Sequence, residues 1–235
     1  MFLLKKKKIF EKIFFDYKKK KLLPKIDLHV HTKWTDGKNN VRDLVRIACK
    51  YKLDYLLFCE HSRRNSKNWF NSFVNEIKYC QLTIKKKCQL LIGTEVKILD
   101  LNGNLDINEE IKKRCDLVIA SVHRFPGEKN ITENTLKIKK QKAIQIEKDL
   151  LTAAIRNSDA DIIGHPFGMS IKRFKIDPPW NFFVDIIKDC RKNNKIFEIN
   201  YYYHKNTKKL VNECIKNKTL FSIGSNAHNK DEILK

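Results

Sequence analysis

The chain of 235 residues and 27.9 kDa has the length of one large domain, and its 42% apolar residues supply a sizeable core, which excludes a disordered tail or a mini-protein. A formal charge of +22 favours anionic partners such as phosphates, although an AT-rich genome is an alternative source of the lysine excess. Seven cysteines without a Cys-x-x-Cys pair exclude a disulfide framework and a zinc ribbon, so we expect reduced thiols and a cytoplasmic location.

Residues 1–24 are predicted to form a basic amphipathic extension, and no apolar run in the chain reaches the roughly 20 residues of a transmembrane segment. Apolar side chains spaced three and four residues apart between the lysines define one helical face: Ile9, Phe10, Ile13, Phe14 and Tyr17. We expect this helix to pack on the following domain, or to contact an anionic surface such as a membrane or nucleic acid. Pro24 marks the boundary.

From residue 25 to residue 235, short apolar runs alternate with helical patterns in a single predicted domain. The expected strands are 26–31, 54–59, 90–98, 116–122, 160–164, 195–200 and 219–224. The expected helices are 40–52, 65–87, 131–157, 180–193 and 205–217. This alternation is typical of a parallel sheet covered on both faces, either an open doubly wound sheet or a closed barrel, and seven strands favour the barrel.

Six of the seven histidines stand at or just past the end of an expected strand: His29, His31, His61, His123, His165 and His228. In a βα barrel the carboxyl ends of the strands open onto one face, so residues far apart in the sequence converge there. His29 and His31 are two residues apart in one strand, so both imidazoles point to the same side. Together these positions predict a metal site.

Two carboxylates complete the predicted donor set. Glu95 lies near the end of the third expected strand, and Asp36 follows the first histidine pair on a loop. Imidazole and carboxylate ligands without a thiolate suit Zn, Mn or Fe in a multinuclear hydrolytic centre.

Seven short motifs occur in a specific order, at 27–32, 35–37, 60–61, 93–95, 121–123, 164–166 and 224–228. They read Asp-x-His-x-His-Thr, Thr-Asp-Gly, Glu-His, Gly-x-Glu, Ser-Val-His, Gly-His-Pro and Gly-Ser-x-Ala-His. In this order they resemble the polymerase-and-histidinol-phosphatase (PHP) family of metal-dependent phosphoesterases. The likeness extends to the PHP domain at the C-terminus of bacterial family-X DNA polymerases, through residues 27–39, 119–123 and 161–166.

The resemblance implies a distorted (β/α)7 barrel with two or three divalent ions, Zn, Mn or Fe, at its C-terminal rim. On the family pattern, His29 and His31 hold the first ion, and Glu95 bridges it to a second ion held by His123 and His165.

The remaining site corresponds to Asp36, His61 and His228. Asn226 occupies a position where the family usually has an aspartate ligand, which removes one negative charge from the cluster. We therefore expect the first site, that of His29 and His31, to bind metal more weakly, or, as the alternative, a degenerate module without catalytic activity.

Clustered dications assist phosphoester hydrolysis by neutralising charge, by activating water and by stabilising the leaving oxygen. Asp27 is a candidate for orienting an imidazole, with a plain loop carboxylate as the alternative. Arg124, directly after His123, is a candidate for bidentate contact with the substrate phosphate.

The leading functional hypothesis is a metal-dependent phosphoesterase that acts on single-stranded DNA or nucleotides, as a 3′–5′ exonuclease or a 3′-end phosphatase. A phosphomonoesterase for a small metabolite such as histidinol phosphate is the second hypothesis. A non-catalytic module that binds metal or nucleic acid is the third. Residues 201–203 are all tyrosine and read as an aromatic cluster, with packing or base stacking as alternative roles, and His204 matches no family metal position.

Overall fold

Seven parallel strands form one sheet in the computed structural model, which describes residues 2–66, 69–84, 87–128 and 138–233. The strands pair in chain order from first to last: β1 (Ile26–Val30), β2 (Tyr55–His61), β3 (Gln89–Lys97), β4 (Leu117–Ser121), β5 (Ile162–Ile163), β6 (Ile196–Asn200) and β7 (Phe221–Gly224). All seven expected strands are therefore present, with ends that shift by at most two residues.

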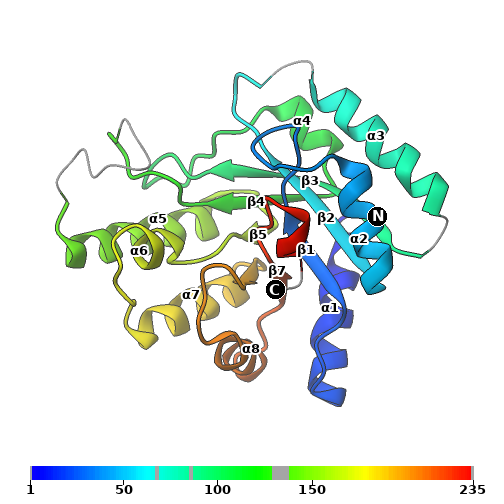
Figure 1. Ribbon diagram of the computed structural model, residues 1–235. Helices are drawn as coiled ribbons and strands as arrows, with labels where there is room; N and C mark the ends of the chain where they lie inside the picture. Colours follow the sequence, from blue (N-terminus) through cyan, green and yellow to red (C-terminus); the bar gives the residue numbers. More distant parts are fainter. Residues whose placement is uncertain (1, 67–68, 85–86, 129–137, 234–235) are drawn as a thin grey trace.

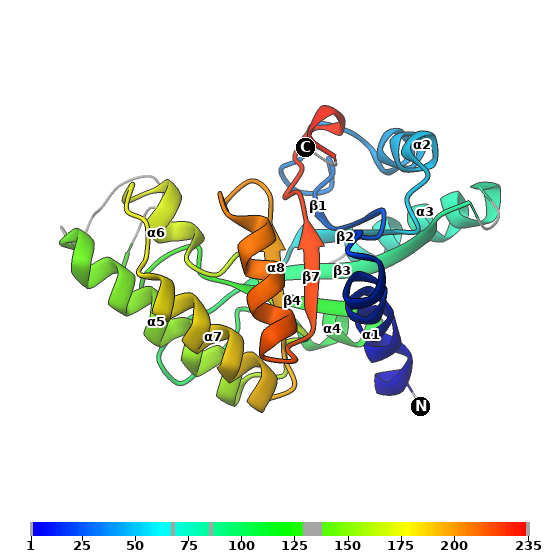
Figure 2. The ribbon, with the colours of Figure 1, turned by 90° about the horizontal axis from the view of Figure 1, so that it is seen from below.

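The sheet curls until its first and last strands meet. A parallel bridge joins Val30, at the end of β1, to Ala227, which follows β7, and the His31 amide donates a hydrogen bond to the Ala227 carbonyl at 2.9 Å. Helices surround the sheet (Figures 1 and 2). The nearly closed seven-stranded barrel confirms the predicted fold class.

The helices are α1 (Phe2–Lys20), α2 (Val41–Tyr51), α3 (Trp69–Ile84), α4 (Glu109–Arg114), α5 (Lys140–Asn157), α6 (Gly168–Lys172), α7 (Trp180–Lys192), α8 (Thr207–Lys216) and the 3-10 turn η1 (Lys230–Glu232). Five of them match the helices expected after residue 25. Parts of two expected helices, residues 67–68, 85–86 and 131–137, lie outside the described residues. The sequence analysis missed α4, α6 and η1, which are each shorter than two turns.

Local signals explain where α2 begins and ends. The Asn40 side chain accepts a hydrogen bond from the Asp43 amide at 2.9 Å, which caps the N-terminus. Lys52 adopts a left-handed conformation with φ of 56° and closes the C-terminus. Between the caps, Val41, Leu44, Val45 and Ala48 face the barrel and are buried.

The apolar face of α1 packs on β7 (Figure 2), and it buries Phe10, Ile13, Phe14 and Tyr17. The Tyr17 ring meets Phe221 edge-on at 6.4 Å, and its hydroxyl donates to the Asn212 side chain at 3.3 Å. Because the barrel covers this apolar face, α1 would contact an anionic surface through its lysines. Among the described residues, no helix combines the length and the apolar composition needed to cross a membrane.

Candidate metal centre

The Glu95 carboxylate, near the end of β3, lies at the centre of a cluster of imidazoles. Its Oε1 is 2.9 Å from His165 Nε2 and 3.1 Å from His123 Nε2. His165 follows β5 and His123 follows β4, so the carboxyl ends of three neighbouring strands supply these side chains.

The second oxygen of Glu95 faces three further histidines. Oε2 is 3.2 Å from His61 Nδ1, 3.4 Å from His29 Nε2 and 3.6 Å from His31 Nε2. Five of the predicted histidine ligands therefore surround one buried carboxylate, as expected for side chains at the carboxyl ends of parallel strands.

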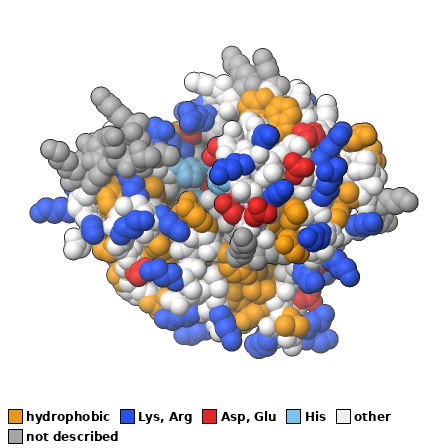
Figure 3. All heavy atoms as spheres, in the orientation of Figure 1, with side chains coloured by type: hydrophobic (Ala, Val, Ile, Leu, Met, Phe, Trp, Pro, Cys, Tyr) orange, Lys and Arg blue, Asp and Glu red, His pale blue; other side chains and the backbone are white. Residues whose placement is uncertain are grey.

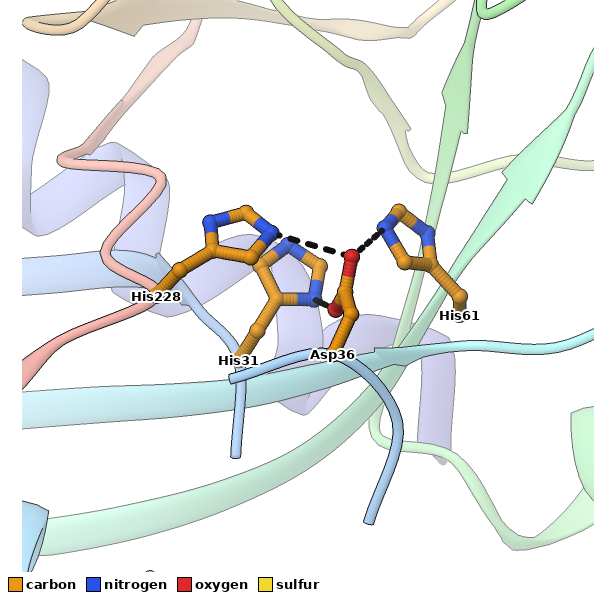
Figure 4. Close-up of side chains that lie close together, drawn as sticks. All are labelled: His31, Asp36, His61 and His228. Carbon is orange, nitrogen blue, oxygen red and sulfur yellow. Dashed lines mark hydrogen bonds and ion pairs between the residues drawn. The ribbon is translucent and has the colours of Figure 1, made fainter. Parts of the chain in front are cut away.

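Asp36 holds the outer part of the cluster (Figure 4). Its Oδ2 is 3.2 Å from Nε2 of both His61 and His228, and its Oδ1 is 3.8 Å from His31 Nδ1. The His31 ring stacks against each of the other two, with ring centroids 4.5 Å from His61 and 4.4 Å from His228. The loop after β1 and the segment after β7 thus meet over the barrel.

Several buried polar atoms of the cluster lack a hydrogen-bond partner among the described residues. They are His29 Nε2, both ring nitrogens of His31 and Glu95 Oε2. Each such atom costs about 1–3 kcal/mol when it is left unsatisfied. A divalent cation bound among these atoms satisfies them, so the donor set fits a metal centre.

A hydrogen bond on the far side of the His228 ring supports this fit. His228 Nδ1 lies 2.8 Å from the Asn226 carbonyl, which only accepts, so Nδ1 is the protonated nitrogen. In the neutral ring the lone pair is then on Nε2, which faces an oxygen of Asp36. A lone pair facing a carboxylate is favourable only with a proton or a cation between them.

The donor atoms gather into overlapping sets, in each of which all atoms lie within 4.8 Å of one another. The sets are His29, Glu95 and His165; His61, Glu95 and His123; His31, Asp36, His61 and His228; and His29, His31 and Cys59. The buried Cys59 thiol was not anticipated, and burial raises its pKa to about 12, so it is a neutral neighbour of the two imidazoles.

The electrostatics keep the central carboxylate charged. Burial raises the pKa of Glu95, but the charges of His123 and His29 outweigh it and hold that pKa well below the usual range. Burial lowers the pKa of His31, and the neighbouring His61 charge lowers it further. Unprotonated imidazole and ionised carboxylate are the metal-binding forms of both groups.

Glu198, in the middle of β6, is a buried contributor that the sequence analysis missed. Its Oε1 lies 2.7 Å from His29 Nδ1, and its Oε2 accepts a hydrogen bond from the His165 backbone amide. Asn200 also donates to Oε1, at 3.1 Å. The sequence signal for this residue is a single carboxylate between the apolar residues of the strand.

Asp27 makes its hydrogen bonds to backbone groups. Its Oδ1 accepts from the amides of Ser225, at 2.9 Å, and His29, at 3.3 Å, and burial raises its pKa to about 6. These bonds tie β1 to the segment after β7, so Asp27 fixes the backbone that carries His29. The imidazole ring of His29 is instead contacted by Glu198, at the Nδ1 atom.

Glu60 secures the loop that carries Asp36. Its carboxylate accepts from the Thr32 amide at 2.7 Å and from the Thr35 hydroxyl. Burial raises the pKa of this carboxyl to about 7, against the effect of both hydrogen bonds.

An open cleft of about 570 Å³ leads to the cluster. Arg63, Lys97 and Arg124 line it together with Asp36, Glu95 and the outer histidines, and Asn226 also borders it. Figure 3 shows histidine atoms in a hollow of this face, with Lys and Arg side chains around it. Arg124 therefore lies in the cleft beside the outer histidines.

His204 lies apart from the metal cluster. Its Nδ1 accepts from the Asn200 amide at 3.1 Å, and its Nε2 donates to the Pro166 carbonyl at 2.9 Å. Burial lowers its pKa to about 4, so the ring is neutral. It joins the turn after β6 to the loop that carries His165.

Comparison with protein-family models decides the relationship. The PHP domain model matches residues 27–202. The chain belongs to the PHP family. The predicted membership of this group of metal-dependent phosphoesterases is thereby confirmed.

This PHP protein is also similar to individual proteins in sequence and in structure. It is 27% identical over 189 residues to "DNA polymerase/3'-5' exonuclease PolX" of Bacillus subtilis, a match of 74% of this chain but only 28% of that longer protein. A Clostridium botulinum protein named "Probable phosphatase" is 29% identical over 220 residues, 86% of this chain and 78% of its own. The histidinol phosphate phosphatase of Lactococcus lactis, solved with zinc, L-histidinol and phosphate, shares the fold with a TM-score of 0.68 at 21% identity, over 88% and 87% of the two chains.

Proposed function

We propose that this PHP protein hydrolyses phosphoesters with a centre of two or three divalent ions, Zn, Mn or Fe. The observation that carries the proposal is the single Glu95 carboxylate surrounded by five imidazoles at the base of a cleft that Arg124 also lines. The proposed ligands are His29, His31, Asp36, His61, Glu95, His123, His165 and His228, with Asn226 at the edge of the site.

The chain's own groups supply binding and orientation. Bound dications supply charge neutralisation and water activation at such a centre. Arg124 is proposed to bind the substrate phosphate, because its guanidinium presents paired donors to phosphate oxygens. Glu198 holds the His29 ring, and Glu60 holds the loop of Asp36, so the donors are fixed before the substrate arrives.

We favour single-stranded nucleic acid ends or nucleotides as the substrate class, with 3′–5′ exonuclease or 3′-end phosphatase activity. The charge of +22 and the likeness to a named 3′–5′ exonuclease support this choice. A small phosphomonoester such as histidinol phosphate is the second candidate, supported by relatives named as phosphatases that match most of this chain. The seven cysteines form no disulfide among the described residues, which supports a reducing, cytoplasmic location.

Hydrolysis of bis(p-nitrophenyl) phosphate, a diester, and p-nitrophenyl phosphate, a monoester, tests the proposal. The wild type, His29→Ala and Asn226→Asp are compared with Mn, Zn or Fe supplied. We expect an active wild type, a silent His29→Ala and an Asn226→Asp that needs less metal. A silent wild type beside an active Asn226→Asp identifies the degenerate module instead, and silence of all three contradicts the proposal.

A further inference from the structure

We propose that Tyr202 and Lys172 form a base-stacking subsite for a single-stranded nucleic acid whose terminal phosphate enters the metal centre. This inference rests on the proposed phosphoesterase function. It specifies the substrate as a strand that extends beyond the cleft.

The subsite begins at the edge of the metal cluster. Tyr203 lines the cleft, and its ring lies 4.3 Å from the His165 ring at an angle of 30°. The Tyr202 ring meets Tyr203 edge-on at 4.9 Å and lies outside the residues that line the cleft. Tyr202 is therefore linked through the Tyr203 ring to His165, a proposed metal ligand. A nucleotide next to the terminal one would lie at this position.

The turn that presents Tyr202 is held from both sides. The Tyr202 amide donates to the Asn200 side chain at 3.1 Å, and the His204 amide donates to the Asn200 carbonyl at 2.9 Å. The buried His204 ring binds both the Asn200 amide and the Pro166 carbonyl. A ring held in place before binding loses little conformational entropy when a ligand stacks on it.

Despite this rigid support, the Tyr202 side chain is 56% exposed. Lys172 Nζ lies 3.8 Å from its ring centroid, a cation–π contact. Burial lowers the pKa of Lys172, and the charges of Lys175 and Lys205 lower it further. Of these, Lys205 is paired with Asp177 at 3.1 Å.

An exposed aromatic face beside cations is how proteins bind single strands, because bases stack on the ring while lysines neutralise phosphates. A small phosphomonoester held inside the cleft does not need this surface. The subsite therefore favours a polymer over a metabolite.

The test uses metal-loaded protein and a fluorescent phosphorothioate dodecamer of thymidine, which resists hydrolysis. A second strand of the same length carries abasic sites in place of the bases. Binding is measured by fluorescence anisotropy for the wild type, Tyr202→Ala, Lys172→Gln and Tyr79→Ala. Tyr79 is the matched control, because it is also 55% exposed with a cation, Arg42, 5.4 Å from its ring centroid, but lies on α3.

We expect Tyr202→Ala to raise the Kd for the thymidine strand about tenfold, with little change for the abasic strand. Lys172→Gln should weaken binding of both strands and reduce the salt dependence, and Tyr79→Ala should match the wild type. The proposal is overturned if the wild type does not bind the strand, if Tyr202→Ala binds it normally, or if Tyr202→Ala loses both strands equally. Hydrolysis of p-nitrophenyl phosphate by the wild type, measured separately, shows whether the phosphoesterase function itself holds.

Discussion

Glu198 Oε1 lies 2.7 Å from Nδ1 of His29, and this contact joins the middle of β6 to β1 over the intervening strand β7. Because carboxylate oxygens only accept, Nδ1 is the protonated nitrogen, and Nε2 faces Glu95. Gly224 makes the contact possible, since a Cβ there would lie 2.5 Å from both Glu198 Oε1 and His29 Cβ. Burial raises the pKa of Glu198, but the adjacent His29 charge and hydrogen bond lower it overall, so the carboxylate stays ionised.

Replacing this carboxylate should loosen the metal centre. We expect Glu198→Gln to weaken divalent metal binding about 10–100-fold, the usual cost of losing a partner that orients a ligand. The measurement is competition with a chromogenic chelator. Asp116→Asn is the control, because Asp116 binds the Ile92 amide at 2.9 Å away from the cluster. Equal metal affinity of Glu198→Gln and wild type would show that the contact does not position His29.

Arg124 should determine affinity for the substrate phosphate. A charge-assisted contact is worth about 2 kcal/mol, so Arg124→Ala should raise KM for p-nitrophenyl phosphate roughly 30-fold. Arg124→Lys keeps the charge but loses the paired donors, and its KM should fall between the two. Arg156→Ala, at an exposed arginine paired with Asp189, serves as the control. An unchanged KM for Arg124→Ala contradicts the assignment.

Glu147 should make stability depend on pH. Its buried carboxylate accepts from the amides of Met169 and Ser170 and from the Ser170 hydroxyl, yet burial raises its pKa to about 7 from the ordinary 4.5. The unfolded chain releases this proton at lower pH than the folded protein, so the folded state binds more protons between these values. The free energy of unfolding therefore falls as pH rises from about 4.5 to 7, by on the order of 3 kcal/mol.

Glu147→Gln removes this titration. Urea unfolding of metal-free protein at about pH 5 and pH 8 should show a loss of stability in the wild type that is smaller in the variant. Other titrating groups are common to both proteins and cancel in the comparison. Identical pH dependence of the two proteins would exclude Glu147 as its source.

The role of α1 is tested by two phenylalanines on one helix. Phe10 is fully buried against the barrel, whereas Phe15 is 62% exposed. Phe10→Ala should lower the free energy of unfolding by about 3–5 kcal/mol, and Phe15→Ala should change it by less than about 0.5 kcal/mol. Chemical denaturation measures both. Equal, small effects would show that α1 does not stabilise the barrel.

The barrel and the convergence of the histidines were predictable for a simple physical reason. Parallel strands place their carboxyl ends on one face, and alternation along β1 puts His29 and His31 on one side. Glu198 was harder to find, because a carboxylate inside a strand points inward or outward according to a register that one sequence does not reveal. The helices α4 and α6 are too short to show a helical period.

The ligand assignment remains a prediction even though the side chains converge. The family pattern pairs His29 with His31 on one ion, whereas the compact donor sets also group His29 with His165 and His61 with His123. Donor atoms this close to one another allow several ways of sharing the ions, so proximity alone does not divide them. Asn226 contacts His228 through its backbone carbonyl, at 2.8 Å from the Nδ1 atom.

Anomalous diffraction from crystals soaked in Mn²⁺ or Zn²⁺ tests the central claim most directly, because it locates the ions themselves. We expect two or three anomalous peaks around Glu95, within bonding distance of His29, His31, His123 and His165. A map without peaks among these side chains, from crystals that bind the metal elsewhere, would contradict it.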